Sequence, residues 1–221
     1  MSDRALGSDP IPRPPGTPSP LQTAADPLRR ELALAAAQLI ADAGLDYRSA
    51  KRKALQQVLG DAAAPRGAMP DNTEVDAALA EHLALFDHDH PERVARMRRV
   101  ALALMDRLQA FNPYLTGAVW KGIVAEHAPI HLQLFHDDPK DVQHALLDDH
   151  LGFEVGEVPH WRGEGRGEVE ALMLAWRGEP VMLSLYRSDD LRGALRGTPP
   201  ERGDAAALRR LLAEPDGAAA R

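Results

Sequence analysis

Four consecutive residues have the side chains best suited to bind a metal ion, two aspartates alternating with two histidines. They are Asp87, His88, Asp89 and His90, and Pro91 follows them directly. A zinc site needs three or four ligands that converge in space, whereas adjacent residues of one loop rarely converge. Proline is favoured in the first turn of a helix, so we interpret this stretch as a solvated loop at a helix start. The sequence therefore predicts no metal site here.

Two runs of basic residues are suited to bind phosphate groups. They are Arg48, Lys51, Arg52 and Lys53 in the first run, and Arg93, Arg96, Arg98 and Arg99 in the second. If both runs lie beside Gly117, they can hold a triphosphate, RNA or a protein partner. If they face outward, they are ordinary solvated surface. No aromatic residues interleave them, so base stacking is not supported.

Several classes of protein are excluded by what the sequence does not contain. The chain of 221 residues has no cysteine, which excludes disulfides, thiolate zinc sites and cysteine nucleophiles. It has no P-loop motif and no Gly-x-Ser-x-Gly motif. The formal charge of −7 argues against general nucleic-acid binding. Without a signal peptide or an apolar run of about 18 to 20 residues, we expect a cytoplasmic protein with no membrane contact.

The most informative segment combines two glycines with an alternating strand. Leu115 to Gly117 ends a predicted strand, Gly122 closes a short turn, and Ile130 to Phe135 alternates as a half-buried strand does. By themselves, the two glycines are also typical of ordinary turns. Their order before an alternating strand makes this segment the candidate site.

This order of elements resembles the nucleotidyltransferase superfamily of the DNA polymerase beta type. The resemblance covers roughly residues 110–195, and more loosely 28–212. In that superfamily a Gly-Ser turn contacts the triphosphate, and a later strand carries an Asp-x-Asp pair. Residues i and i+2 of a strand share one face, so two carboxylates there hold two divalent metal ions together with a third acid on a neighbouring strand. The resemblance implies an α+β fold and transfer of a nucleotide from an NTP to an unknown acceptor.

Three stretches are similar to a group of bacterial nucleotidyltransferase-like proteins whose substrate is unknown. They are Asp46–Ala54, Phe111–Gly117 and Leu132–Asp138. In that group an intact Asp-Ile-Asp stands at the place of Pro129-Ile130-His131. The serine of the turn is replaced by Ala118, and Val181 to Leu185 offers no third acid. The chain therefore resembles a member with a degenerate metal site.

The resemblance implies a nucleotide-binding site without a resident metal, made of Thr116, Gly117, Ala118, Lys121, Gly122 and His131. Mg²⁺ is implied only if transferase activity is retained on substitute acids, for which the candidates are Glu126, Asp137, Asp138, Glu168 and Glu170. His131 is suited to contact a phosphate or to bond a neighbouring carbonyl. The function stays open between weak nucleotide transfer and a pseudoenzyme that binds a nucleotide, RNA or a protein.

The elements that position this site follow from periodicity and composition. Residues 1–27 contain 7 of the 18 prolines and are predicted to be a disordered tail. Residues 28–110 form four helices, of which the third begins at Thr73, and 111–198 form a nucleotidyltransferase-like core. Residues 199–221 are a C-terminal helix and a frayed tail. The predicted fold is α+β, with an N-terminal helical region packed on a small mixed sheet. Within the core, we expect helices at 139–150 and 189–196 and strands at 130–135, 153–157, 168–176 and 180–186.

Overall fold

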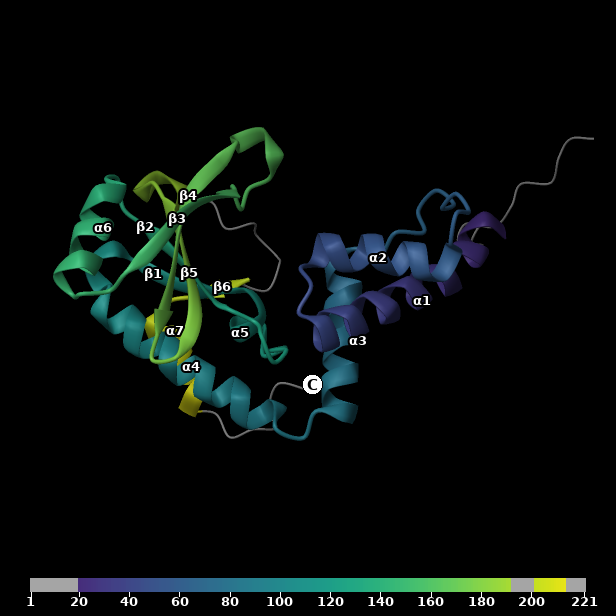
Figure 1. Cartoon of the computed structure of the whole chain (residues 1–221), viewed down its shortest axis with the longest axis horizontal. Coiled ribbons are helices and arrows are strands. Elements are labelled where there is room, and N and C mark those ends of the chain that lie inside the picture. Colours follow the sequence, from purple (N-terminus) through teal and green to yellow (C-terminus); the bar gives the residue numbers. More distant parts are fainter. Residues whose placement is uncertain (1–19, 192–200, 214–221) are drawn as a thin grey trace, which may run out of the picture.

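The computed structural model describes residues 20–191 and 201–213 of the chain (Figure 1). Within these ranges the α-helices are α1 (Pro20–Ala43), α2 (Tyr47–Leu59), α3 (Asn72–Phe86), α4 (His90–Arg107), α5 (Gly117–Lys121), α6 (Pro139–Asp148) and α7 (Ala205–Ala213). The strands are β1 (Pro113–Thr116), β2 (Ile130–Phe135), β3 (Phe153–Pro159), β4 (Glu168–Trp176), β5 (Glu179–Tyr186) and β6 (Arg202–Gly203). Short 3₁₀ turns lie at Gln109–Phe111, Glu164–Arg166 and Ser188–Leu191. The fold class is α+β, as the sequence predicts.

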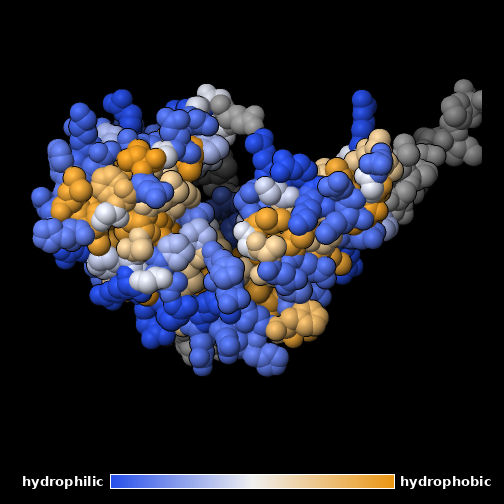
Figure 2. All heavy atoms as spheres, in the orientation of Figure 1, coloured by the Kyte–Doolittle hydropathy of each residue, from blue (hydrophilic) through white to orange (hydrophobic). Residues whose placement is uncertain are grey.

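The molecule has two lobes that meet at the connection between α3 and α4 (Figures 1 and 2). Helices α1 to α3 form the helical lobe, whose core is largely alanine and leucine. The remaining elements form the sheet lobe, and α4 belongs to the core of that lobe. The hydrophobic clusters therefore divide the chain between α3 and α4, whereas periodicity placed the boundary after residue 110.

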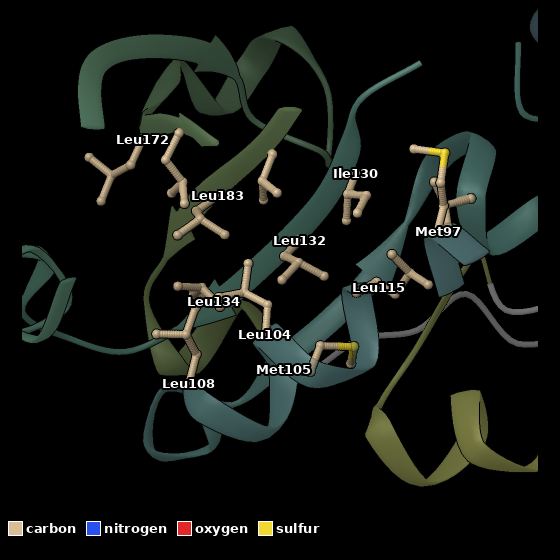
Figure 3. Close-up of a cluster of buried hydrophobic side chains, with 14 of the residues drawn as sticks. Met97, Leu104, Met105, Leu108, Leu115, Ile130, Leu132, Leu134, Leu172 and Leu183 are labelled. Atoms are coloured by element: carbon tan, nitrogen blue, oxygen red, sulfur yellow. The ribbon is translucent and has the colours of Figure 1, made fainter. Parts of the chain in front are cut away.

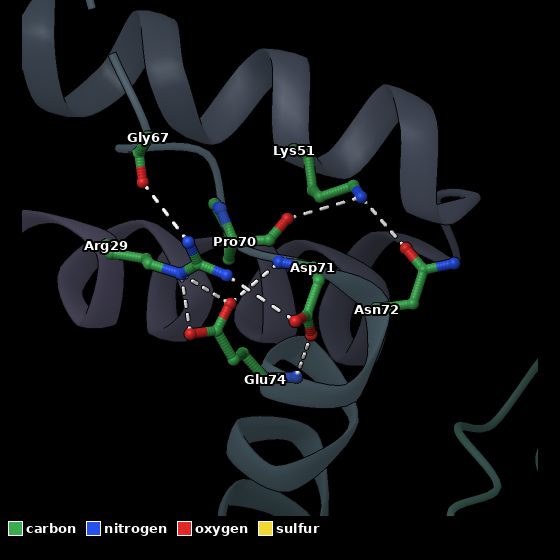
Figure 4. Close-up of polar contacts among 7 residues, drawn as sticks. All are labelled: Arg29, Lys51, Gly67, Pro70, Asp71, Asn72 and Glu74. Atoms are coloured by element: carbon green, nitrogen blue, oxygen red, sulfur yellow. Dashed lines mark hydrogen bonds and ion pairs between the residues drawn. The ribbon is translucent and has the colours of Figure 1, made fainter. Parts of the chain in front are cut away.

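Local hydrogen bonds fix the ends of the helices in the helical lobe. Asp71 accepts from the Glu74 N–H at 2.9 Å, and Glu74 accepts from the Asp71 N–H at 2.7 Å, which is a complete capping box. Arg29 of α1 donates to Glu74 at 2.6 Å and to the Gly67 carbonyl at 3.3 Å (Figure 4). These bonds fasten the loop before α3 to α1.

The sheet has six strands in the order β3-β4-β5-β2-β1-β6, in which β2 and β5 are parallel and the other neighbours are antiparallel. Alternate residues of each strand point to opposite faces. Side chains of β1, β2, β4 and β5 on one face pack against α4 and are fully buried (Figure 3). The labelled residues of this core are Met97, Leu104, Met105, Leu108, Leu115, Ile130, Leu132, Leu134, Leu172 and Leu183. Each such side chain contributes about 1.5–3 kcal/mol through burial.

Two predicted helix starts and one predicted helix differ from the structure. Helix α1 begins at Pro20, so residues 20–27 of the predicted tail are helical. The rest of that tail, residues 1–19, lies outside the described residues. Helix α3 is capped by Asp71, two residues before Thr73. The helix predicted at 189–196 is a 3₁₀ turn as far as Leu191, and the rest falls outside the described residues. No helix in the described ranges is both long and apolar enough to span a membrane.

The loop between α5 and β2 joins the two lobes. Ala125 of this loop packs into the core of the helical lobe. Two side chains of α4 bond the backbone of Val124. The Val124 N–H donates to His90 Nε2 at 3.2 Å, and the Val124 carbonyl accepts from Arg93 at 3.2 Å. Lys121 at the end of α5 forms an ion pair of 2.7 Å with Asp76 of α3.

Candidate functional site

Three of the predicted site residues, Thr116, Gly117 and His131, lie together at the end of β1. Thr116 and His131 are directly opposite in the antiparallel ladder, so their side chains share one face. Gly117 has φ +70°, and a Cβ there would lie 3.3 Å from His131 Nδ1. Burial lowers the pKa of His131, which keeps its ring neutral at pH 7. Ala118 follows as the second residue of α5.

Lys121 and Gly122 lie at the opposite end of α5. Gly122, with φ +74°, is the C-cap of the helix, and a Cβ there would lie 2.9 Å from Arg98 Nη2. Arg98 donates to the carbonyls of Val119 at 3.1 Å and Trp120 at 3.0 Å. Gly122 thus fits closely against Arg98 of α4, at the end of α5 that is about one helical turn from Gly117.

The glutamates of β4 point away from His131. Glu168 and Glu170 share the face of Leu172, which packs in the helix-covered core. Gln143 of α6 donates to Glu170 Oε1 at 2.7 Å. These acids therefore cannot replace the superfamily's metal ligands on the face of His131.

The remaining candidate acids are occupied at loops and helix ends. Asp137 accepts from the Ser188 N–H at 3.0 Å, and Asp138 caps α6 through the Lys140 N–H at 2.9 Å. Glu126 lines a hollow beside α4, and Pro129 precedes the first residue of β2. Within the described residues, no three acidic or histidine side chains form a metal-binding group. The residues at this place do not fit a two-metal site.

A row of four opposed residues crosses the sheet on the face of His131. Arg202 of β6 is opposite Thr116, Thr116 is opposite His131, and His131 is beside Met182 of β5. We call Arg202, Thr116, His131 and Met182 the central row, and the sheet face that carries them the polar face. This row thus holds a neutral histidine and a methionine, with an arginine at its other end.

The Arg202 guanidinium reaches over the polar face into a group of aromatic rings. Its Nη1 donates to Gln133 Oε1 at 2.9 Å. Its Cζ lies 4.5 Å from the ring centroid of Trp161, 4.9 Å from that of Phe135 and 5.4 Å from that of Tyr114. Such distances are typical of cation–π contacts. They hold the cation in a half-buried position.

A second guanidinium contacts the same tryptophan. Arg162 Cζ lies 4.8 Å from the Trp161 ring centroid. We call Trp161, Arg162 and Arg202 the arginine–tryptophan cluster. Arg162 donates to the Asp190 carbonyl at 2.9 Å and lies 3.8 Å from the Asp190 carboxylate, which is also 3.4 Å from His160 Nε2.

Arg202 and Trp161 have donors that the described residues do not satisfy. Burial lowers the pKa of Arg202, and the charge of Arg162 lowers it further, yet an arginine stays protonated at pH 7. In the described ranges, Arg202 has no carboxylate partner within ion-pair distance. The Trp161 Nε1 atom is buried and has no hydrogen-bond acceptor among the described residues. The arrangement is therefore suited to accept an anion.

The two basic runs do not form one surface over Gly117. On α4, Arg93 pairs with Asp87 and Arg96 with Glu179, while Arg98 caps α5. On α2, Lys51 donates to Asn72 at 2.8 Å and to the Pro70 carbonyl at 3.4 Å (Figure 4). The hollows that the two runs line have no residue in common.

The loop Asp87–His90 starts α4, as the sequence predicts. Asp87 accepts from Arg93 at 2.5 Å, which lowers the pKa of its carboxyl. His90 accepts from Val124, and burial lowers its pKa. Asp89 is the N-cap residue and makes no side-chain cap bond. These side chains serve the junction between α4 and the loop after α5.

Sequence reasoning did not single out the arginine–tryptophan cluster. The adjacent Trp161 and Arg162 follow strand β3, and such an aromatic-basic pair in a glycine-rich loop is a signal that was available. The sequence around Arg202 shows no strand pattern, because β6 has only two residues. Its partner strand β1 is also far away in the sequence.

Comparisons of the chain with family models, with curated proteins and with solved structures found no match.

Proposed function

We propose that the chain is a nucleotidyltransferase-like module that binds a nucleoside triphosphate without the metal pair and without turnover. The order of elements supports the proposal, because β1, the Gly117 turn, short helix α5 and antiparallel β2 follow the sequence resemblance, and β5 lies parallel beside β2. The observation that carries it is the central row, in which neutral His131 stands at one of the two positions where the resemblance expects a carboxylate, and Arg202 lies two strands away in the same row.

Electrostatics favours metal-independent binding on the polar face. Mg²⁺ prefers oxygen ligands in octahedral geometry, and neither His131 nor Met182 supplies an oxygen. The fixed charge of Arg202 repels a divalent cation and attracts a phosphate. A guanidinium thus supplies the positive charge that metal ions supply in the superfamily.

The start of α5 offers further donors to the ligand. Thr116 is the N-cap residue, but its hydroxyl donates to the Glu201 carbonyl at 2.9 Å and makes no cap bond. The first N–H groups of a helix have no partner within the helix. With Gly117 in a left-handed conformation, we propose that the N–H groups of this turn contact the nucleotide next to His131.

Thermal unfolding tests the proposal with ATP, GTP, CTP and UTP, each in EDTA and in excess Mg²⁺, with adenosine as the control. A ligand at about 100 times its dissociation constant stabilises a protein by about 2.7 kcal/mol. For a chain of this size each 1 kcal/mol raises the midpoint by about 2–4 °C, so the midpoint then rises by about 5–11 °C. We expect a rise that does not require Mg²⁺. A rise that appears only with Mg²⁺, together with pyrophosphate release, would contradict the proposal.

The location of the chain and its partners are predictions from the sequence. We predict a cytoplasmic location, and an RNA or protein partner for the basic runs. Weak transfer on substitute acids also stays a prediction, and single changes of Glu126, Asp137, Asp138 and Glu170 test it through loss of any measured transfer.

A further inference from the structure

Trp161 lies next to two guanidinium groups and has an unsatisfied donor of its own. The Arg162 and Arg202 carbons Cζ lie 4.8 Å and 4.5 Å from its ring centroid. Its Nε1 atom is buried without an acceptor among the described residues. A buried N–H without a partner costs stability, and proteins rarely leave one in place without a reason. An acceptor between the two arginines would satisfy it.

The charges around Trp161 also call for an anion. The chain has 33 acidic and 26 basic residues, so carboxylates are plentiful. Yet of the two arginines only Arg162 is near one, at 3.8 Å from Asp190, and that carboxylate also lies 3.4 Å from His160. Arg202 has five N–H donors, and one of them bonds Gln133. Arg202 therefore brings a half-buried positive charge to the Trp161 ring, with no carboxylate among the described residues within ion-pair distance.

We propose that the arginine–tryptophan cluster binds the phosphate chain of the nucleotide. This inference rests on the proposed function and assigns the residues that take the place of the metal ions. A di- or triphosphate has several oxygens and several charges, so it accepts from the Trp161 indole and from two guanidinium groups at once. A carboxylate, with two oxygens and one charge, leaves part of this donor set unused.

The position of the cluster suits this role. Arg202 is directly opposite Thr116 in the central row, next to the Gly117 turn. Its guanidinium bonds Gln133, which lies two residues beyond His131 on the same face. The guanidinium lies over Tyr114, Gln133 and Phe135, two to four residues along β1 and β2 from Thr116 and His131, so a phosphate chain held there lies along the polar face.

Trp176 provides a matched control. Its Nε1 atom is also buried without an acceptor in the described part of the chain, and the Arg177 Cζ lies 5.4 Å from its ring centroid. Trp176 is in the same register as Leu172 and Leu174, on the helix-covered face of the sheet. It has one arginine beside it and lies on the face opposite to Arg202, so it lacks the second guanidinium that defines the proposed site.

The test is isothermal titration in EDTA with tripolyphosphate, ATP and adenosine as probes. We expect tripolyphosphate and ATP to bind the wild-type chain and adenosine not to bind. Trp161→Phe retains an aromatic ring and removes the N–H donor, so it weakens tripolyphosphate binding by about tenfold. Trp176→Phe makes the same chemical change on the other face and leaves tripolyphosphate affinity unchanged.

Changes of Arg202 provide a second, independent measurement. Arg202→Gln removes the charge and should abolish tripolyphosphate binding, whereas Arg202→Lys retains the charge and loses the planar fork, which gives an intermediate affinity. Circular dichroism and the unfolding midpoint show whether each variant is folded. If Arg202→Gln does not fold, Trp161→Phe and Arg202→Lys still decide the question.

The outcomes separate this inference from the proposed function. If ATP binds but Trp161→Phe and the Arg202 variants bind tripolyphosphate as the wild type does, the phosphate assignment is wrong and the proposed function stands. If tripolyphosphate binds through Arg202 and ATP binds less tightly than tripolyphosphate, the phosphate site is correct and a nucleotide is not its ligand. If neither probe binds, both proposals are wrong.

Discussion

At the scale of residues, the sign of charge decides which ligand the polar face can take. In the superfamily that the sequence resembles, paired carboxylates attract metal ions, which in turn attract phosphate. Here Arg202 is in the central row and His131 is neutral because burial lowers its pKa. In the proposed site, one arginine in this row supplies positive charge for a phosphate and disfavours a metal ion.

Gly117 has a conformation that other residues rarely adopt. Its φ is +70°, and a Cβ would lie 3.3 Å from His131 Nδ1. We expect Gly117→Ala to lower the free energy of unfolding by about 1–2 kcal/mol. Urea denaturation measures this. Gly152→Ala, where no atom lies within 4 Å of a new Cβ and φ is not positive, should change stability by about 0.5 kcal/mol or less. Equal effects of the two changes would contradict the turn geometry.

His90 makes the stability of the chain depend on pH. Burial, together with the charges of Arg93 and Arg98, lowers its pKa below the ordinary value of 6.5, while Asp87 opposes the shift. The unfolded chain then binds more protons than the folded chain below pH 6.5, so stability is present above that value and is lost as pH falls. His131 contributes with the same sign.

The measurement is the free energy of unfolding from urea titrations between pH 7.5 and pH 5. We expect a decrease toward pH 5 that becomes smaller in His90→Gln, because glutamine does not titrate. His88→Gln, at an exposed position of the same loop, is the control and should keep the wild-type slope. A His90→Gln slope equal to that of the wild type would show that His90 is not responsible.

At the scale of elements, strand β6 depends on one glycine. A Cβ on Gly203 would overlap the Trp120 ring of α5. We expect Gly203→Ala to lower the free energy of unfolding by about 1–3 kcal/mol through overpacking. Because β6 also carries Arg202, the change should weaken tripolyphosphate binding in titration calorimetry. Gly165→Ala, with open space around a new Cβ, is the control for both measurements. Unaltered binding in a destabilised Gly203→Ala would separate β6 from the phosphate site.

Periodicity predicted those elements whose pattern is local. Strands β2 and β4 alternate or run long enough to be recognised, and their bounds agree with the prediction. The first helix was predicted to begin at residue 28, after the proline-rich tail, whereas α1 begins at Pro20. Thr73 and Asp71 are both of common N-cap types, and the start was predicted at Thr73. The capping box with Glu74 distinguishes them.

The candidate site was predicted only where strand alternation governs it. The alternation of β1 and β2 places Thr116 and His131 on one face, and the structure brings them together. Lys121 and Gly122 are close to Gly117 in sequence, but they lie at the other end of α5, which sequence distance does not reveal. The arginine–tryptophan cluster joins β6 to the loop after β3 and depends on tertiary contacts alone.

At the scale of the whole molecule, Lys121 joins the sheet lobe to the helical lobe. It pairs with Asp76, which also accepts from the Tyr47 hydroxyl. We expect Lys121→Met to lower the free energy of unfolding by about 1 kcal/mol and to increase hydrogen exchange in residues 122–129. ATP affinity should stay unchanged, because Lys121 is paired with Asp76 and is not part of the arginine–tryptophan cluster.

The control for this change is Lys140→Met, at an exposed position of α6 with no side-chain ion pair in the described residues. It should leave stability, hydrogen exchange and ATP affinity as they are. Loss of ATP binding in Lys121→Met with wild-type stability would instead place Lys121 in the nucleotide site, as the sequence resemblance implies.

The most direct measurement is the ATP affinity of the full chain by titration calorimetry, in EDTA and again in saturating Mg²⁺. If guanidinium groups replace the metal ions, ATP binds in EDTA at least as tightly as with Mg²⁺, because Mg²⁺ neutralises the charge that Arg162 and Arg202 recognise. Added salt weakens this binding by screening. Binding of ATP that requires Mg²⁺ would contradict the assignment and would show that other acids have rebuilt a metal site.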